Sequence, residues 1–156
     1  MKIIQDTREK QGWDFIFAEN LEIVRAGLKY GDYTTELLEN QFRVERKAST
    51  GELYNNLATT KNKERFYREL EQLEKFEKAY IVCEFPEGYL SDFPKNSGIP
   101  KNRLKFLRIK SRYFCRLVKE LEEKFDIDLV FCNDRYEAEA FVYNIAKKLE
   151  QDISSL

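Results

Sequence analysis

The order of apolar segments along the chain predicts an α/β fold with a three-layer mixed sheet flanked by helices. Short apolar segments joined by a polar turn occupy the first third of the sequence, which is typical of antiparallel strands. Further on, strand-like segments alternate with helical patterns, which is typical of parallel strands. We expect one domain over residues 1–150 and a frayed tail over residues 151–156.

Six segments have the length and composition of strands. They are Lys2–Gln5, Leu21–Ala26, Tyr33–Leu38, Phe42–Arg46, Ala79–Phe85 and Ile127–Cys132. The polar residues Glu39, Asn40 and Gln41 predict a turn between the third and the fourth of these strands.

Four further segments place apolar residues at helical spacing. Ser49 or Thr50 caps a short helix, and a longer helix carries Phe66, Leu70 and Leu73 on one stripe. We expect a long amphipathic helix from Lys101 to about Phe125, after a loop over Pro86–Pro100. The last helix has an apolar stripe formed by Ala138, Phe141, Ile145 and Leu149.

The composition excludes several classes of protein. No run of apolar residues is long enough to cross a membrane, and the charged N-terminus is unlike a signal peptide, so we expect an intracellular protein with no membrane partner. The chain has no histidine, which excludes Ser–His and Cys–His nucleophile pairs and histidine-ligated zinc. Hydrolysis would have to use carboxylates, lysine and a metal that prefers oxygen ligands, Mg²⁺ or Mn²⁺.

One short pattern carries chemistry, Asp32 followed by Glu45, Arg46 and Lys47. Glu45 and Lys47 share one face of a strand because side chains alternate with a period of two. The expected hairpin brings Asp32 next to Glu45, and the main-chain carbonyl of Arg46 completes a half-shell of hard oxygen ligands for a divalent cation. Lys47 would orient the attacking water and offset charge on the phosphate. The same pattern also occurs on ordinary solvated strands, where it forms a weak ion pair.

Four motifs in order resemble the XPF-type nuclease domain, a branch of the PD-(D/E)XK nucleases that includes XPF and the archaeal Hef. The motifs are Asp6-Thr7-Arg8-Glu9, Gly31-Asp32-Tyr33, Val44-Glu45-Arg46-Lys47 and Arg65-Phe66 with Glu69. The similarity extends from Ile3 to about Leu149. It implies a restriction-endonuclease-like core and a metal-dependent DNA endonuclease that acts on branched or single-strand/double-strand junction DNA and leaves 5′-phosphate ends.

The resemblance assigns a role to each matching residue. It implies that Asp32 and Glu45 bind Mg²⁺ or Mn²⁺ and that Lys47 positions the water, while Asp6 and Arg8 line the site. Within this catalytic set, Arg46 would face away from the metal and pair with a carboxylate beneath the sheet. Glu52 is similar to the acidic residue that follows the motif, but it lies one position late. Arg65 and Glu69 are either a pair that supports the metal ligands or a surface pair.

A strongly basic segment indicates a nucleic-acid surface. Nine basic residues and no acid lie between Lys95 and Lys119. On a continuous helix, six of them would share one face: Lys101, Lys105, Arg108, Arg112, Arg116 and Lys119. Like charges at this spacing cost about 0.2–0.5 kcal/mol per pair, so we expect phosphate contact to compensate. A merely solvated face, or pairing with acids elsewhere in the chain, is the alternative.

Two further functions remain open at the level of sequence. One is a catalytically inactive scaffold for a nuclease, which the presence of Asp32, Glu45 and Lys47 disfavours. The other is a different PD-(D/E)XK enzyme, such as a junction-resolving or restriction nuclease. The resemblance also implies a homodimer. Because no tandem helix-hairpin-helix pattern follows the core, we expect either a stand-alone nuclease of phage or mobile-element origin, with a separate DNA-targeting protein as a further partner, or a fragment.

Overall fold

A computed structural model describes residues 1–108 and 110–156. A single six-stranded sheet crosses the molecule in the order β2-β1-β3-β4-β5-β6. Its strands are β1 (Lys2–Asp6), β2 (Glu22–Ala26), β3 (Tyr33–Thr35), β4 (Phe42–Lys47), β5 (Lys78–Cys83) and β6 (Asp128–Phe131). Strand β3 runs antiparallel to both β1 and β4, whereas β4, β5 and β6 are parallel to one another. The expected mixed sheet is confirmed.

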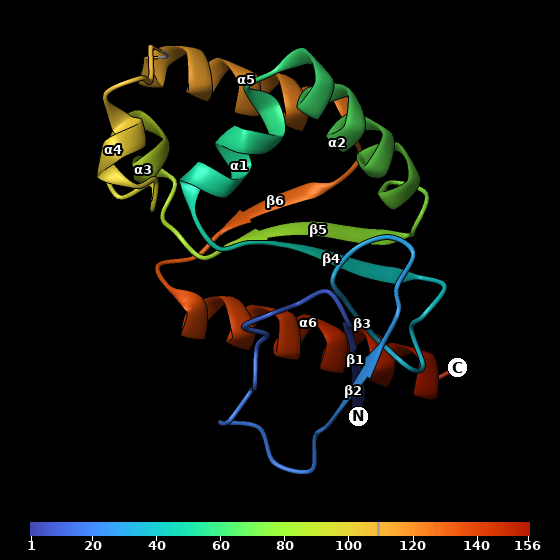
Figure 1. Cartoon of the computed structure of the whole chain (residues 1–156). Coiled ribbons are helices and arrows are strands. Elements are labelled where there is room, and N and C mark those ends of the chain that lie inside the picture. Colours follow the sequence, from blue (N-terminus) through green and yellow to red (C-terminus); the bar gives the residue numbers. More distant parts are fainter. Residues whose placement is uncertain (109) are drawn as a thin grey trace.

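Helices cover both faces of the sheet, which makes three layers (Figure 1). They are α1 (Thr50–Leu57), α2 (Thr60–Leu73), α3 (Gly88–Ser91), α4 (Lys101–Leu104), α5 (Ser111–Lys124) and α6 (Arg135–Ser154). Helices α1, α2 and α5 lie over one face, where Leu53, Leu70 and Phe114 belong to one buried apolar cluster. Helix α6 covers the other face, and Ala138, Val142 and Ala146 belong to a second cluster. No helix in the described residues is long and apolar enough to cross a membrane.

The turn between β3 and β4 is longer than the sequence predicts. Strand β3 ends at Thr35 rather than Leu38, because the Thr34 hydroxyl donates to the carbonyl of Phe42 at 2.7 Å and Leu38 N–H bonds back to Thr35. Only Tyr33 and Val44 form a ladder pair between the two strands. At the other end of β4, Ser49 caps α1 as expected, since its side chain accepts from the backbone N–H of Glu52.

The expected helix from Lys101 to about Phe125 is wrong. The chain forms the short α4, leaves helical geometry after Lys105 and begins α5 at Ser111, with Lys110 in an extended conformation. The first half of the expected helix places positive charges at helical neighbours without an acid to offset them, which disfavours a continuous helix. At the C-terminus, α6 continues through Ser154, so four residues of the expected tail are helical.

Candidate active site

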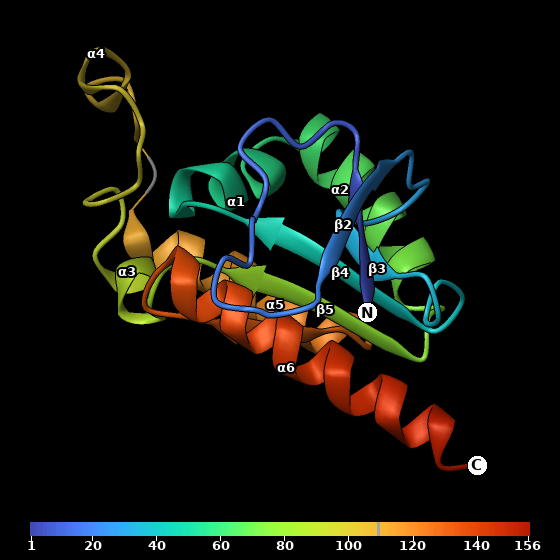
Figure 2. The ribbon, with the colours of Figure 1, turned by 90° about the horizontal axis from the view of Figure 1, so that it is seen from below.

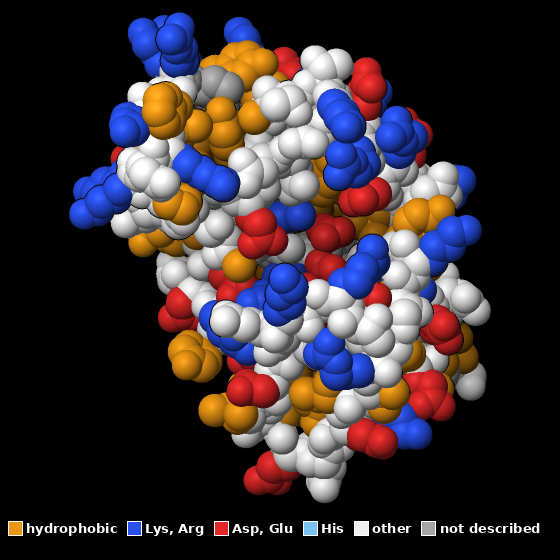
Figure 3. All heavy atoms as spheres, viewed as in Figure 1, with side chains coloured by type: hydrophobic (Ala, Val, Ile, Leu, Met, Phe, Trp, Pro, Cys, Tyr) orange, Lys and Arg blue, Asp and Glu red, His pale blue; other side chains and the backbone are white. Residues whose placement is uncertain are grey.

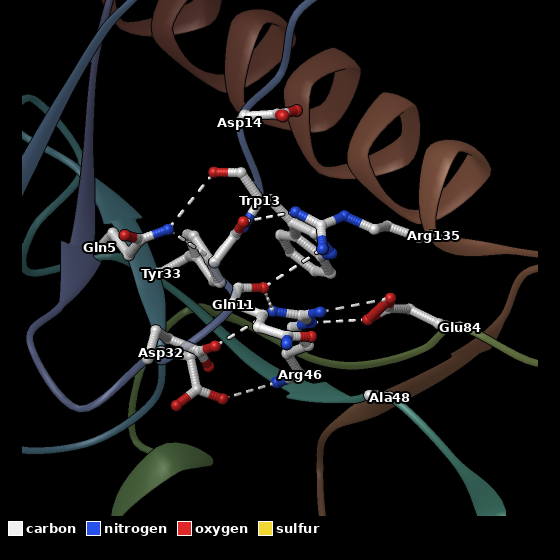
Figure 4. Close-up of polar contacts among 12 residues, drawn as sticks. Gln5, Gln11, Trp13, Asp14, Asp32, Tyr33, Arg46, Ala48, Glu84 and Arg135 are labelled. Atoms are coloured by element: carbon white, nitrogen blue, oxygen red, sulfur yellow. Dashed lines mark hydrogen bonds and ion pairs between the residues drawn. The ribbon is translucent and has the colours of Figure 1, made fainter. Parts of the chain in front are cut away.

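The pairing of β3 with β4 brings Asp32, the residue directly before β3, against strand β4. Gly31 adopts a φ of +79°, a conformation that favours glycine, and a Cβ there would meet the carbonyl oxygen of Val44 at 3.2 Å. The Asp32 N–H donates to that carbonyl at 2.7 Å. In return, the Arg46 N–H donates to Asp32 Oδ2 at 2.8 Å, as Figure 4 shows. The carboxylate is therefore fixed beside the Glu45–Lys47 motif.

The same hydrogen bonds orient the main chain of Arg46. In a strand, the N–H and C=O groups of one residue point toward the same neighbouring strand. Because the Arg46 N–H meets Asp32, its carbonyl points to the same side of β4. The Lys47 carbonyl points the other way and accepts from Glu84 N–H at 2.9 Å. The arrangement fits the oxygen half-shell that the sequence predicts.

Glu45 lies in an environment that favours its neutral form. Its side chain is 15% exposed, and burial raises the pKa of the carboxyl well above its usual range. Lys47, whose Nζ lies 3.8 Å from Glu45 Oε1, lowers this pKa, while Asp32 and Glu69 raise it. A divalent cation would neutralise such a group of facing carboxylates, so the donor set fits a hard cation.

Glu9, the last residue of the Asp6–Glu9 motif, lies beside the site although its sequence position does not predict this. Burial and the nearby Asp32 carboxylate raise the pKa of Glu9 to about 7, against the opposing effect of Arg46. Arg46 Nη1 lies 3.1 Å from Glu9 Oε2, so the arginine holds Glu9 on the edge of the Asp32 site. Within the described residues, no group of three or more Asp, Glu, Cys or His side chains is arranged to hold a metal ion. A bound cation would therefore need main-chain oxygen or water as well.

Arg46 itself faces away from Glu45 and acts as a clamp. Its Nε donates to Glu84 Oε2 at 2.6 Å, which provides the carboxylate partner that the sequence predicts beneath the sheet. Its Nη1 also donates to the carbonyl of Gln11 at 2.7 Å, and its guanidinium lies 5.2 Å from the Trp13 ring (Figure 4). Arg46 thus ties β4 to the end of β5 and to the loop that carries Glu9.

Further contacts hold the same loop against the sheet and α6. The Trp13 ring stacks on Tyr33 at 4.6 Å, and the Tyr33 hydroxyl accepts from Trp13 N–H and from Gln5 Nε2. Arg135 of α6 donates to the carbonyls of Gln11 and Gly12 (Figure 4). No local pattern in the sequence pairs these residues, because the Tyr33 contacts join positions 20 and 28 apart and the Arg135 contacts join positions more than 100 apart.

Asp6 and Arg8, which belong to one motif, differ in exposure: Asp6 is buried and Arg8 is exposed. The Asp6 side chain is 2% exposed, and its oxygens accept from Leu28 N–H at 2.9 Å and from Arg8 Nε at 2.6 Å. Burial raises the pKa of Asp6, but these hydrogen bonds and the Arg8 charge outweigh burial and lower it overall. Arg8 is 70% exposed and lines the pocket with Asp32. Asp6 therefore orients Arg8, and Arg8 is available to a ligand.

A pocket of about 380 Å³ opens beside these residues. It is lined by Arg8, Lys29, Tyr30, Gly31, Asp32, Glu45, Glu69, Leu70 and Leu73. On the space-filling surface, acidic side chains gather near the centre of this face with basic side chains around them (Figure 3). Acidic and basic side chains thus lie together around one hollow.

Of the remaining predicted catalytic and supporting residues, only Glu69 lines this pocket. Lys47 is 8% exposed, and its Nζ lies 5.0 Å from the centroid of the Phe66 ring. Glu52 is exposed at the start of α1, where its carboxylate accepts from Ala48 N–H at 3.2 Å, a helix-capping contact. Glu69 lines the pocket, but Arg65 does not, and the two form no ion pair among the described residues. Of that pair, the structure brings only Glu69 to the site.

The six predicted nucleic-acid-binding residues are all exposed but do not share one helix face. Lys101 is on α4, Lys105 and Arg108 follow it, and the other three lie on α5. None of the six forms an ion pair with an acid elsewhere in the described part of the chain. Arg108, Arg112 and Arg116 line one hollow of about 730 Å³ together with Ala58, Lys110 and Tyr113. Three of the six predicted charges therefore gather around this hollow, and the six do not form one stripe along a helix.

The clustered carboxylates predict an unusual dependence of stability on pH. An unfolded glutamate titrates near pH 4.3, so between about pH 5 and 7 the folded protein holds a proton on Glu9 that the unfolded chain releases. The free energy of unfolding should then fall with rising pH in this range, by on the order of 2 kcal/mol without metal. The lowered pKa of Asp6 changes the free energy of unfolding only at more acidic pH.

Urea unfolding in a chelator at pH 5 and pH 8 measures this effect. Asp32→Asn keeps an acceptor for Arg46 N–H but removes the charge that faces Glu9 and Glu45. The variant should therefore be more stable than the wild type at pH 8 and show a flatter pH profile. Stability that rises between pH 5 and pH 8 in the wild type would contradict this description of the site.

Comparisons with known proteins agree with the fold. The model of the ERCC4 domain family matches residues 5–145. XPF from Aeropyrum pernix is similar in structure, with a TM-score of 0.66 and 18% identity over 94% of this chain and 60% of that one. XPF from Aeropyrum pernix in complex with DNA is similar with a TM-score of 0.67 and 18% identity, over 97% of this chain and 66% of that one. The chain thus spans less than two thirds of either structure. Among curated proteins, none matches. The expected restriction-endonuclease-like core is confirmed.

Proposed function

The chain belongs to the ERCC4 domain family, and on that premise we propose that it is a metal-dependent DNA endonuclease. One observation carries the proposal. Asp32 and Glu45 face each other in an open pocket, with the Arg46 carbonyl directed to the same side and Lys47 and Arg8 close by. One of the similar structures is a complex with DNA, which supports DNA as the ligand.

Asp32 and Glu45, with the Arg46 carbonyl, would hold Mg²⁺ or Mn²⁺, and Glu9 stands beside them. Such an ion would supply Lewis-acid activation of the phosphate and would lower the pKa of a bound water molecule. The Lys47 ammonium, 3.8 Å from Glu45, would orient that water and offset negative charge as it develops on the phosphate. Exposed Arg8, held by Asp6, would contact a phosphate oxygen. The expected products carry 5′-phosphates, and branched or junction DNA is the proposed substrate.

The hollow lined by Arg108, Arg112 and Arg116 would hold DNA by its phosphates. Replacing all three by glutamine should weaken binding to any sequence, because each phosphate contact adds about −0.9 to the slope of log K against log salt on duplex DNA. The slope should become shallower by about two to three units. Saturating DNA at low salt should restore most of the cleavage rate, because the pocket at Asp32 is unchanged.

Salt titrations by fluorescence anisotropy measure this slope. Lys147→Gln with Lys148→Gln is a matched control, since both lysines are exposed on α6, across the sheet from the hollow. If the triple variant keeps the affinity and the salt slope of the wild type, the hollow is a solvated surface that does not bind DNA.

We also propose a homodimer. Strand β6 is at the edge of the sheet, and its residues Leu129 and Val130 line a shallow hollow of about 520 Å³ with Phe141 and Ile145 of α6. These side chains are half-buried in one copy, so a second copy would cover apolar surface. Light scattering should give the mass of a dimer at micromolar concentration, and Ile145→Glu should lower it. A monomer at high micromolar concentration would contradict the dimer.

A further inference from the structure

Between α3 and α5, residues 100–108 project from the body of the molecule, and we call them the arm. It carries α4, which stands clear of the sheet and of the other helices in Figure 2. The segment 95–119, which contains the arm and the first nine residues of α5, holds nine basic residues and no acid. In Figure 3 the basic side chains near α4 lie at the edge of the face that has the acidic centre. The arm is thus a positively charged extension beside the candidate active site.

Phe106 lies on this arm and is 72% exposed. It belongs to neither buried cluster, and Lys105 Nζ lies 5.2 Å from the centre of its ring. Burial of a phenylalanine side chain stabilises a fold, and this exposed ring forgoes that gain. Its neighbour Leu107 packs partly against the first cluster. The arm therefore presents the aromatic ring outward and turns the aliphatic side chain inward.

A second aromatic ring stands at the base of the arm. Tyr113 is 38% exposed and lines the hollow with Arg108, Arg112 and Arg116. The Arg116 guanidinium lies 5.1 Å from its ring centre. Among the residues that the structure describes, no acidic side chain lines this hollow. Aromatic rings interleaved with unpaired cations are the combination that binds single strands, because the cations follow the phosphates and the rings stack on bases.

Helix α1 connects the hollow to the candidate active site. It begins at Thr50, three residues after Lys47, and Ala58 directly after its end lines the hollow. Its eight residues span roughly 12 Å at 1.5 Å per residue. A strand held in the hollow would therefore lie about one short helix away from Lys47.

We propose that the arm and the hollow bind single-stranded DNA, with phosphates on Arg108, Arg112 and Arg116 and a base stacked on Phe106. Duplex DNA offers phosphates to the same arginines, but its bases are already stacked on one another, so an exposed ring gains little from it. The inference rests on the proposed function in one respect, because it assigns the single-stranded part of the nuclease substrate to this surface. Binding itself can be measured without cleavage.

The test compares two labelled probes in a chelator, an oligothymidine of about 20 nucleotides and a blunt duplex of the same length. Loss of one base-stacking contact, which contributes about 1–3 kcal/mol, should make Phe106→Ala bind the oligothymidine about 5- to 150-fold more weakly. Duplex affinity should change less than about twofold. Phe106→Trp should restore the single-strand affinity, and Tyr136→Ala, which removes a ring 65% exposed on α6, should have no effect.

Two results would overturn the proposal. One is that Phe106→Ala binds the oligothymidine as tightly as the wild type does. This result would mean that the exposed ring contacts a protein partner and not a base. The other is an equal loss on both probes, which would mean that the ring shapes the arm rather than stacks on a base. Because these measurements exclude metal, they are independent of cleavage. A wild-type protein that never cuts DNA but shows the Phe106-dependent preference would refute the endonuclease alone.

Discussion

Asp32→Ala and Glu45→Ala are each expected to abolish DNA cleavage while the protein stays folded. Both side chains belong to the proposed oxygen donor set beside the Arg46 carbonyl, so either change removes a proposed metal ligand from the pocket. Removing either one also relieves the repulsion that raises the pKa of Glu45 or Glu9. Metal-free stability should therefore hold or increase, although Asp32→Ala loses the acceptor for Arg46 N–H.

Asp32→Asn separates the charge of Asp32 from its hydrogen bond. It should be as inactive as the alanine variant, with thermal unfolding in a chelator at or above that of the wild type. Glu52→Gln is the matched control, since Glu52 is an exposed carboxylate outside the pocket. This control variant should cut at a rate near that of the wild type. An Asp32→Asn protein that cuts normally would remove Asp32 from the catalytic set.

Lys47→Ala is expected to lower the cleavage rate by about 10²–10³, a typical loss for one preorganised electrostatic contact. The ammonium is largely buried, lies 3.8 Å from Glu45 Oε1 and rests on the Phe66 ring, so its position is fixed before substrate binds. Its loss removes a positive charge near the carboxylates, so metal affinity should hold or rise. Single-turnover cleavage and a calorimetric Mn²⁺ titration on the same variant measure the two effects separately.

Lys63→Ala is a matched control for Lys47→Ala. Lys63 is a partly exposed lysine on α2 that pairs with Glu120 at 3.7 Å, away from the pocket. Its loss should leave the rate unchanged. A Lys47→Ala protein that cleaves at the wild-type rate and no longer binds Mn²⁺ would mean that Lys47 supports the metal site and does not act on the water or the phosphate.

The sequence predicts the sheet and the Asp32, Glu45 and Lys47 arrangement because both follow from local periodicity. Alternation along β4 places Glu45 and Lys47 on one face and Arg46 on the other, and Gly31 indicates the close turn before β3. The length of β3 is predicted less well. The Thr34 hydroxyl bonds to the Phe42 carbonyl and shortens the ladder, a contact that composition does not reveal.

Other parts of the site depend on contacts between distant segments. Glu9 lies at the pocket edge because Arg46 holds it, and Arg46 is in turn fixed by Glu84, 38 positions later. The basic residues after Pro100 have helical spacing, but one continuous helix would stack their charges without acids. The chain instead breaks after Lys105, and spacing alone does not predict that break.

Cleavage of a DNA panel with and without metal tests the central claim most directly. The panel contains duplex, single-stranded, flap, fork and plasmid DNA, each incubated with Mg²⁺, Mn²⁺, Ca²⁺ or EDTA. We expect Mg²⁺ or Mn²⁺ to support cutting of at least the branched substrates to 5′-phosphate ends, and EDTA or Asp32→Asn to abolish it. Cleavage that persists in EDTA, or that Asp32→Asn leaves intact, would contradict a metal-dependent nuclease centred on Asp32 and Glu45.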